Sequence, residues 1–330
     1  MAQTSIPIVA YHQVRPGGRM TPARLDEHLR ALSARGWETI TPDDVLAFLG
    51  GGPPPRRRRA CLLTFDDGYL DFWIHAFPLL RAHGARATVY LITGRSGGPG
   101  PPRALPEAAG EIRTGWELNN HASLNPGPAP GFLNAAEITA MAGSGLVTFG
   151  AHSHLHLPAW VSGRAAGRLD GRPEWWLESV LGRKPRQGET LHRWNAALAC
   201  ERWIPPGNGG RGHLETVDER RARVLEELEV SGAAFAQSLG AAPRHFAYPW
   251  GRYDDLLVDC LRASGYRTAA TLDRGANARG DDPLKLARFD AKGHGGRWLL
   301  ARLALHARAL PARVYGAVSG RRGGAAAIRP

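Results

Sequence analysis

Two groups of residues in this 330-residue chain have the side-chain types and the spacing of a catalytic metal site. Asp66 and Asp67 follow the apolar run 60–65, and His152 and His156 stand four residues apart after a second apolar run. Two adjacent carboxylates at the end of a buried strand are costly unless a cation or a proton balances them, although the same pair would also suit a helix cap. Two imidazoles and one carboxylate form a three-ligand set that leaves positions open for water. The pattern therefore predicts a divalent-metal site.

The segments between these residues alternate between strand-like and helix-like patterns. The expected strands span residues 6–11, 37–40, 60–65, 87–93, 145–149, 246–248 and 268–272. The expected helices span residues 21–35, 41–48, 73–83, 216–239 and 253–264. Glu219 follows Thr216 by three residues, which predicts a capping box at the start of the fourth helix. Short strands that alternate with helices predict βαβ units and a parallel sheet.

Two stretches interrupt the alternation. Residues 94–131 are rich in glycine and proline and are expected to form one long loop. Residues 160–213 contain five of the ten tryptophans, which are too many for a solvated linker, so the rings either pack into a small core of their own or line a ligand-binding wall. We expect a mixture of both.

Within that tryptophan-rich stretch, Trp175 and Trp176 are expected to be the core pair. The pocket residue is expected to be Trp160 or Trp203. Because the stretch begins directly after His156, its root must lie at the rim where substrate enters. We therefore expect it to set substrate choice.

Charge and cysteine content exclude several classes of protein. The net charge is +12, but only three of the 42 basic residues are lysines, and the arginines are spread along the whole chain. Nucleic-acid binding is therefore not expected, and the dense arginine cluster at 56–59 is interpreted as a solvated loop. Three cysteines without a CxxC pair support neither a disulfide framework nor a thiolate zinc site. With no secretory signal and no run of about 18 apolar residues, the expected location is the cytoplasm.

Three motifs carry a resemblance to a known family. They are TFDDG at 64–68, HSHLH at 152–156 and FAYPWGRYDD at 246–255. Together they resemble the signature motifs of the polysaccharide deacetylases, carbohydrate esterase family four, which share the NodB-type homology domain. The branch of that family that deacetylates poly-N-acetylglucosamine is similar in further segments, namely IPIVAYHQV at 6–14, the stretch 132–153, and parts of 265–289.

The resemblance covers roughly residues 5–160 and 214–290, and it implies a distorted (β/α)7-type barrel whose site lies at the C-terminal strand ends. On this basis residues 1–296 form the barrel, with the insertion 160–213 at the active-site rim. Residues 297–330 are expected to form an amphipathic helix, over 297–315, and a basic tail that frays. The helix either packs on the side of the barrel or lies on an anionic bilayer.

The resemblance also implies roles for the acidic and imidazole residues. Asp66 matches the general base, which removes a proton from the attacking water. Asp67, His152 and His156 match the ligands of one divalent ion, with zinc expected and Co²⁺, Ni²⁺ or Fe²⁺ as alternatives. Such an ion lowers the pKa of water towards ~7 and polarises the amide carbonyl. His154 matches no required position and is expected to be exposed or to lie behind the ligands.

The third motif implies a substrate wall and an oxyanion donor. The backbone N–H of Trp250 is expected to stabilise the tetrahedral oxyanion. The Trp250 ring, with Tyr248 and Pro249, is expected to contact the sugar. Ala247 departs from the commonest family pattern, which has an arginine that steadies the catalytic aspartate. Arg288 is the candidate to replace that arginine, the alternative being that it is a surface residue.

The general acid has no clear match, because the Leu-x-His pattern that supplies it elsewhere in the family is missing. His294 is the nearest positional candidate. His12, at the end of the first strand, is expected to have a structural or pocket role rather than to act as the acid.

These features predict a metal-dependent hydrolase that removes an N-acetyl group from an amino sugar or glycan. A deformylase or deacylase of a lipid-linked or small-molecule amino sugar, or a cyclic amide hydrolase, is the alternative on the same fold. A lipid-linked substrate would bring the protein to the inner membrane face. A carbohydrate-binding module without activity is a third reading, which the four intact metal-site residues disfavour.

Overall fold

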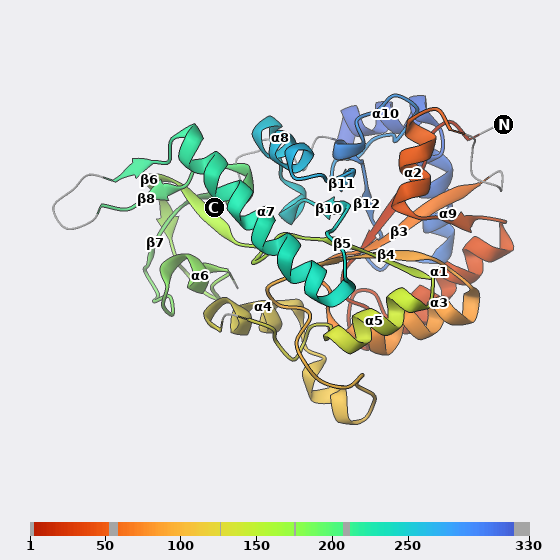
Figure 1. Cartoon of the computed structure of the whole chain (residues 1–330), viewed down its shortest axis with the longest axis horizontal. Helices are drawn as coiled ribbons and strands as arrows, with labels where there is room; N and C mark the ends of the chain where they lie inside the picture. Colours follow the sequence, from red (N-terminus) through yellow and green to blue (C-terminus); the bar gives the residue numbers. More distant parts are fainter. Residues whose placement is uncertain (1–2, 53–58, 126, 175, 207–211, 320–330) are drawn as a thin grey trace.

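One sheet of eight strands, all paired in parallel, organises the molecule (Figure 1). The computed structural model describes residues 3–52, 59–125, 127–174, 176–206 and 212–319. The strand order is β11-β10-β5-β4-β3-β1-β12, and β2 pairs with β3. The strands are β1 (Ile8–Tyr11), β2 (Glu38–Thr39), β3 (Ala60–Phe65), β4 (Ala87–Leu91), β5 (Val147–Ala151), β10 (His245–Ala247), β11 (Thr268–Ala270) and β12 (Phe289–Asp290). Because the pairings are parallel, the C-terminal ends of neighbouring strands meet at one edge.

The two edges of this sheet are linked by one short segment, residues 286–290, which closes the sheet into a distorted barrel. At one end of the segment, Leu286 bridges Ala270 of edge strand β11. At its other end, Phe289 and Asp290 form β12 and pair with β1. The predicted barrel of parallel strands is therefore confirmed, and its closure depends on a single β-bridge rather than on a regular pair of strands.

Helices cover the outside of the sheet close to where the sequence predicts them. They are α1 (Pro22–Ala34), α2 (Pro42–Leu49), α3 (Phe77–His83), α5 (Ala135–Gly143), α7 (Val217–Leu239) and α8 (Asp255–Ala263). The capping box predicted at Thr216 and Glu219 is present at the start of α7. Helix α3 is preceded by a π-helical turn, Phe72–Ala76, inside the helix predicted over 73–83. Local capping residues and apolar periodicity therefore determine where most of these helices begin and end.

Residues 94–131 differ from the single long loop that was predicted, because they contain helix α4 (Gly115–Leu124). The helix is anchored by a segment distant in sequence. The indole N–H of Trp116 donates to the carbonyl of Pro173 (3.3 Å), and the Arg172 guanidinium lies 3.7 Å from the centre of the Trp116 ring. Contacts of this kind leave no trace in local periodicity, so glycine and proline content alone predicts a loop.

The tryptophan-rich insertion is built on an antiparallel pair of strands that projects from the barrel (Figure 1). Its elements are β6 (Pro158–Arg168), α6 (Leu177–Leu181), β7 (Thr190–Ala196), β8 (Trp203–Ile204) and β9 (His213–Leu214). A register shift in β6 between Trp160 and Ala165 breaks the strand alternation that would otherwise show in the sequence. That irregularity explains the weak periodicity of the segment.

The C-terminal segment forms two helices, α9 (Gly296–His306) and α10 (Ala309–Ser319), where the sequence predicted one. Pro311 lies in the first turn of α10, where a missing N–H costs nothing, so it suits the start of a new helix. Leu299 and Leu303 of α9 are fully buried in the main core, and α9 packs against α1. This helix therefore packs on the side of the barrel. In the part of the chain that the structure describes, no helix is both long and apolar enough to cross a bilayer.

Three expectations fall on residues outside the described ranges. They concern Trp175 as a core residue, the arginine cluster at 56–58, and the tail over 321–330. Arg59, the last residue of that cluster, is described and exposed, as expected for a solvated loop.

Candidate active site

The three predicted metal ligands come together at the C-terminal ends of β3 and β5. Asp67 lies two residues beyond β3, and His152 is the first residue after β5. His156 completes the set from the turn that follows. One ligand atom from each of the three residues lies within 4.8 Å of the other two, and His152 Nε2 is 3.5 Å from Asp67 Oδ1. This spacing is what a single ion bound by all three would require.

The backbone that presents these ligands is held in an uncommon conformation. Asp67, Ser153 and His156 have φ angles of 77°, 63° and 54°, in the left-handed region that non-glycine residues rarely adopt. The Ser153 hydroxyl accepts a hydrogen bond from the His156 N–H (2.8 Å), which fixes the turn between the two histidines. Such strain persists only where surrounding contacts determine it, and it concentrates at functional sites.

The donor set fits a divalent metal ion. Nδ1 of His152 is 2.8 Å from the carbonyl of Ala247, and because a carbonyl oxygen only accepts, Nδ1 carries the proton. The lone pair of Nε2 is then left on the side of Asp67. Burial holds the pKa of His156 well below its ordinary value, so this ring is neutral, the form that binds metals. One carboxylate and two neutral imidazoles match the preference of zinc and similar ions.

Arg288 forms a two-pronged ion pair with Asp66, at 2.7 and 2.9 Å. Both residues are buried, with exposed fractions of 1% and 3%, so the alternative that Arg288 is a surface residue is wrong. The guanidinium is also held by Thr64 Oγ1 (3.1 Å) and the Thr271 carbonyl (2.8 Å). Burial alone would raise the pKa of Asp66, but the attraction of Arg288 outweighs it, and the pKa lies well below its usual range. Asp66 is therefore an oriented carboxylate beside the candidate metal site.

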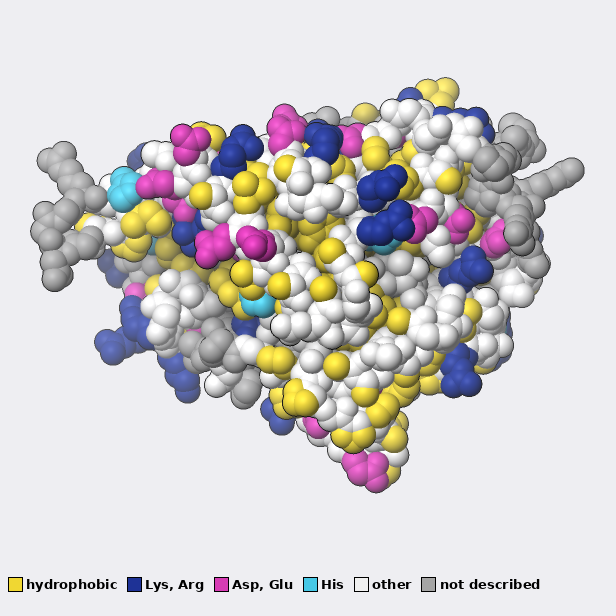
Figure 2. Space-filling view, in the orientation of Figure 1, with side chains coloured by type: hydrophobic (Ala, Val, Ile, Leu, Met, Phe, Trp, Pro, Cys, Tyr) yellow, Lys and Arg dark blue, Asp and Glu magenta, His cyan; other side chains and the backbone are white. Residues whose placement is uncertain are grey.

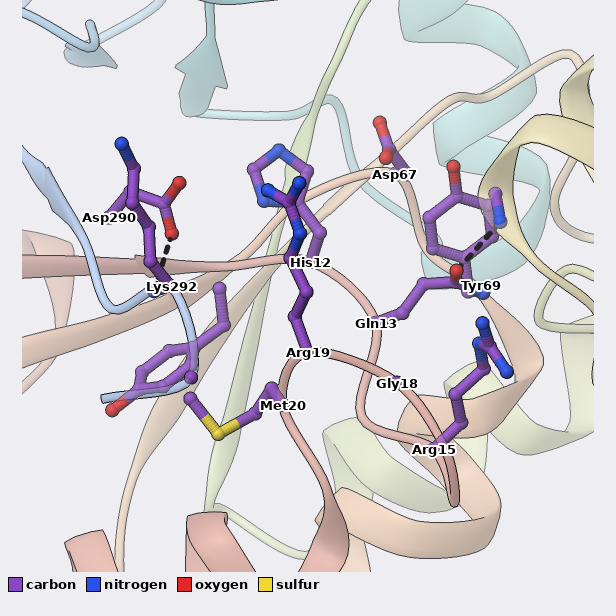
Figure 3. A pocket seen from close by; sticks show the side chains of 13 residues that line it. His12, Gln13, Arg15, Gly18, Arg19, Met20, Asp67, Tyr69, Asp290 and Lys292 are labelled. Carbon is purple, nitrogen blue, oxygen red and sulfur yellow. Dashed lines mark hydrogen bonds between the residues drawn. The ribbon is translucent and has the colours of Figure 1, made fainter. Parts of the chain in front are cut away.

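A cavity of about 410 Å³ opens beside Asp67 and contains His12 (Figure 3). The charge of His12 acts on both Asp66 and His156, which indicates that its imidazole lies near them. His294 lies elsewhere. It is exposed, stacks on Trp298 with ring centres 4.3 Å apart, and lines a neighbouring cavity. The structure thus brings His12, and not His294, into the cavity that holds Asp67.

Sequence reasoning missed Asp71, whose side chain connects the loop after His12 to the segment that carries Asp66 and Asp67. Its side chain is buried and its Oδ2 accepts the N–H of Val14 (2.9 Å), two residues after His12. Burial raises the pKa of Asp71 to about 7. The only local hint is that Asp71 follows Asp67 by four residues at the start of a helix.

Among the predicted substrate residues of the third motif, Trp250 alone is partly exposed. Its ring centre lies 4.1 Å from that of His156, and its φ of 54° places the backbone in the left-handed region. Tyr248 is fully buried and its hydroxyl donates to the Leu284 carbonyl (2.8 Å), and Pro249 is also buried. The expectation that these two side chains contact the sugar is therefore wrong, because they pack in the core beneath Trp250.

The tryptophans of the insertion are arranged differently from the prediction. Trp160 and Trp176 are buried in a cluster, so Trp160 is not the pocket residue, and Trp203 is partly buried against the same cluster. Trp194 connects this cluster to the site, with its ring centre 4.7 Å from that of Trp176 and 5.5 Å from that of Trp250. The prediction of a small core is confirmed for Trp176. The ring that reaches the site is Trp194, which strand β7 directs towards Trp250.

His154, between the two ligands, faces away from them. Its Nδ1 is 3.1 Å from the Thr93 hydroxyl, and burial lowers its pKa. This agrees with the expectation that it lies behind the metal ligands.

Comparison with known proteins gives one family and one fold. Residues 54–188 match the family model for polysaccharide deacetylase. The putative polysaccharide deacetylase YxkH of Bacillus subtilis (strain 168) is 34% identical over 89 residues, which are 26% of this chain and 32% of that protein. The match thus spans about a third of the length of this curated relative.

Solved structures share the fold over most of the chain. IcaB from Ammonifex degensii has a TM-score of 0.58 at 21% identity, with 91% of this chain and 97% of that chain covered. A de-N-acetylase from Aggregatibacter actinomycetemcomitans has a TM-score of 0.63 at 17% identity, covering 90% and 99%. The BpsB deacetylase domain from Bordetella bronchiseptica has a TM-score of 0.60 at 22% identity, covering 87% and 96%. The match to the polysaccharide deacetylase model includes Asp66 and all three candidate metal ligands, and the solved structures show the same fold.

Proposed function

We propose that this protein is a metal-dependent hydrolase that removes the N-acetyl group from an amino sugar of a glycan, of the poly-N-acetylglucosamine kind. One observation carries the proposal. Three ligand atoms from Asp67, His152 and His156 lie within 4.8 Å of one another, and the carboxylate of Asp66 is held beside them by Arg288. The match to the polysaccharide deacetylase model and structural relatives that are themselves named deacetylases support the same reaction class.

Asp67, His152 and His156 would hold the ion, for which zinc is the proposed identity. When bound, it would lower the pKa of water towards ~7 and polarise the amide carbonyl. Asp66 takes the proton of the attacking water, because Arg288 keeps this carboxylate ionised and fixes its orientation. The N–H of Trp250 is the proposed donor to the oxygen that gains negative charge.

The leaving amine needs a proton, and we assign its donor to His12. This imidazole lines the same cavity as Asp67, whereas His294 lines the neighbouring one. The charge of His12 stabilises the ionised carboxylate of Asp66, which agrees with a position near it. A base on one side and an acid on the other is the arrangement that amide hydrolysis requires.

Replacing His12 by glutamine is expected to lower kcat by about 100-fold, since a positioned acid contributes at least that factor. KM should change little, because glutamine keeps the polar contact. His294→Gln is the matched control and should keep most of the activity. The measurement is acetate release with each purified variant. A larger loss in His294→Gln than in His12→Gln would return the acid role to His294.

Trp194 is the proposed link between the insertion and substrate choice. Trp194→Ala should lower kcat/KM on the preferred glycan about tenfold, mainly through KM, because a ring that braces the Trp250 wall is lost. Metal content should stay unchanged, since Trp194 is not one of the three candidate ligands. Trp194→Phe, which keeps an aromatic face, should recover most of the loss. Equal kcat/KM in all three proteins would leave the insertion with a stabilising role instead.

The reaction itself is tested by acetate release from N-acetylglucosamine oligomers, with and without prior removal of metal by a chelator. The expected result is acetate production that stops on chelation and returns with added Zn²⁺. Absence of acetate from every N-acetylated sugar, with the ion bound, would contradict the proposed function.

A further inference from the structure

A second, smaller cavity of about 180 Å³ lies next to the one that contains Asp67. The two cavities share Asp290 and Lys292, which stand on the side of His12 away from Asp67 (Figure 3). The walls of the second cavity come from the loop after β11, which carries Arg274, and from the two C-terminal helices. A molecule held at Asp67 could therefore extend across Lys292 into the second cavity.

Cations dominate the lining of this second cavity. Arg274, Arg302 and Lys292 surround it, and in the described residues none of the three forms an ion pair with a carboxylate. Among the described residues that line it, Asp290 is the one acidic side chain, and it accepts the backbone N–H of Lys292 (3.0 Å).

Aromatic rings hold the guanidinium groups in place. The carbon of the Arg302 guanidinium lies 5.3 Å from the centre of the Trp298 ring and 4.8 Å from that of Tyr315. Arg274 lies 5.6 Å from the Tyr315 ring. Contact with a ring face leaves the N–H groups at the edge of a guanidinium available for an anion. His294 stacks on Trp298 as well, so this indole is already covered and is poorly placed to stack on a sugar.

Close backbone packing fixes the positions of these cations. A Cβ at Gly316 of α10 would come within 2.2 Å of the Arg274 carbonyl oxygen, so only glycine lets α10 sit directly on that loop. A Cβ at Gly293 would come within 2.1 Å of the Arg19 carbonyl oxygen. Lys292 itself has a φ of 47°, in the left-handed region. The cationic cavity is therefore part of the packed fold and not a chance meeting of surface side chains.

We propose that this second cavity is a subsite for a phosphate group attached to the amino-sugar substrate. Three cations without carboxylate partners match the charge of a phosphate, and guanidinium groups match its geometry. Arg15 and Arg19 line the first cavity and extend the positive surface towards Asp67. The identity of the sugar rests on the proposed function, whereas the phosphate subsite rests on the second cavity alone.

Binding of glucose 1-phosphate and of glucose, measured by calorimetry, tests the subsite independently of hydrolysis, because neither sugar has an amide. Glucose 1-phosphate is expected to bind at least tenfold tighter than glucose. Arg302→Gln and Lys292→Gln should each remove about tenfold of that preference, as expected for a charge-assisted hydrogen bond. Arg297→Gln is the matched control, since Arg297 lies on the same helix but lines a different cavity.

Three outcomes would overturn the subsite. The first is equal affinity for glucose 1-phosphate and glucose. The second is an equal loss of affinity for glucose 1-phosphate in Arg297→Gln and Arg302→Gln. The third is a preference for glucose 1-phosphate that vanishes when metal is chelated but persists in Arg302→Gln. The last result would mean that the metal centre binds the phosphate. Thermal unfolding of each variant checks that α10 stays docked, and Lys292→Gln gives the answer if Arg302→Gln does not fold.

Acetate release then identifies the source of the phosphate. The arms are N-acetylglucosamine 1-phosphate, a nucleoside diphosphate N-acetylglucosamine, and N-acetylglucosamine linked through diphosphate to a short polyprenol in detergent. The substrate with the highest kcat/KM identifies the source of the phosphate. The proposal is supported if this high kcat/KM is lost in Arg302→Gln and kept in Arg297→Gln. Tight binding of glucose 1-phosphate without acetate release from any arm would keep the subsite and reject the deacetylase function. Acetate release from neutral oligomers, with no preference for phosphorylated sugars, would keep the deacetylase function and reject the phosphate subsite.

Discussion

His152→Ala is expected to weaken binding of the divalent ion by more than 100-fold and to abolish activity. The substitution removes one of three ligands and also the hydrogen bond from Nδ1 to the Ala247 carbonyl that orients the ring. Loss of such an orienting contact alone typically costs about 10- to 100-fold in metal affinity, so loss of the ligand itself costs more. Metal content by mass spectrometry and affinity by competition with a chelator give the measurement.

The matched control for this variant is His154→Ala. It removes an imidazole two residues away that contacts Thr93 rather than the metal ligands. Its metal content should equal that of the unmodified protein. Retention of one tightly bound ion by His152→Ala, or its loss from His154→Ala, would contradict the assignment of the ligands.

Asp66→Asn is expected to keep the bound ion. Its rate of acetate release should fall by about 10²- to 10⁴-fold, the usual contribution of a general base. An amide cannot take a proton from water. The substitution also leaves the buried Arg288 without its countercharge, which costs roughly 3–5 kcal/mol of unfolding free energy. Single-turnover acetate release and denaturant unfolding measure the two effects separately.

A double variant separates catalysis from stability. Asp66→Asn combined with Arg288→Met removes both charges, so the unfolding free energy should partly recover while the rate stays low. If activity returned together with stability, Asp66 would serve only as the partner of Arg288, and another group would accept the proton.

The strands and the ligands were predictable because their signals are local. Residues 60–65 form a continuous apolar run that can only be a buried strand, and the two carboxylates follow it directly. The capping box at Thr216 likewise depends on two side chains three residues apart. A parallel sheet then brings the ends of such strands together without further information.

What could not be predicted depends on contacts between distant segments. Arg288 reaches Asp66 across 222 residues of sequence, and only the closure of the barrel shows that it is buried. The sequence favours His294 over His12 as the candidate acid, yet of these two histidines only His12 lines the cavity that contains Asp67. In the insertion, packing between strands and a helix buries Trp160 and Trp176 and brings Trp194 to Trp250, and composition cannot reveal that arrangement.

The segment that closes the barrel, residues 286–290, has a consequence for the order in which the protein is assembled. It is the last strand of the sheet to leave the ribosome, and it carries Arg288. Until this segment docks, Arg288 cannot balance the charge of the Asp66 carboxylate. A buried anion without its partner lowers the stability of a partly synthesised barrel. The same event that completes the ring of strands also neutralises that anion. A nascent chain can therefore form the candidate metal site early, but Asp66, the proposed base, gains its partner Arg288 only when the sheet is complete.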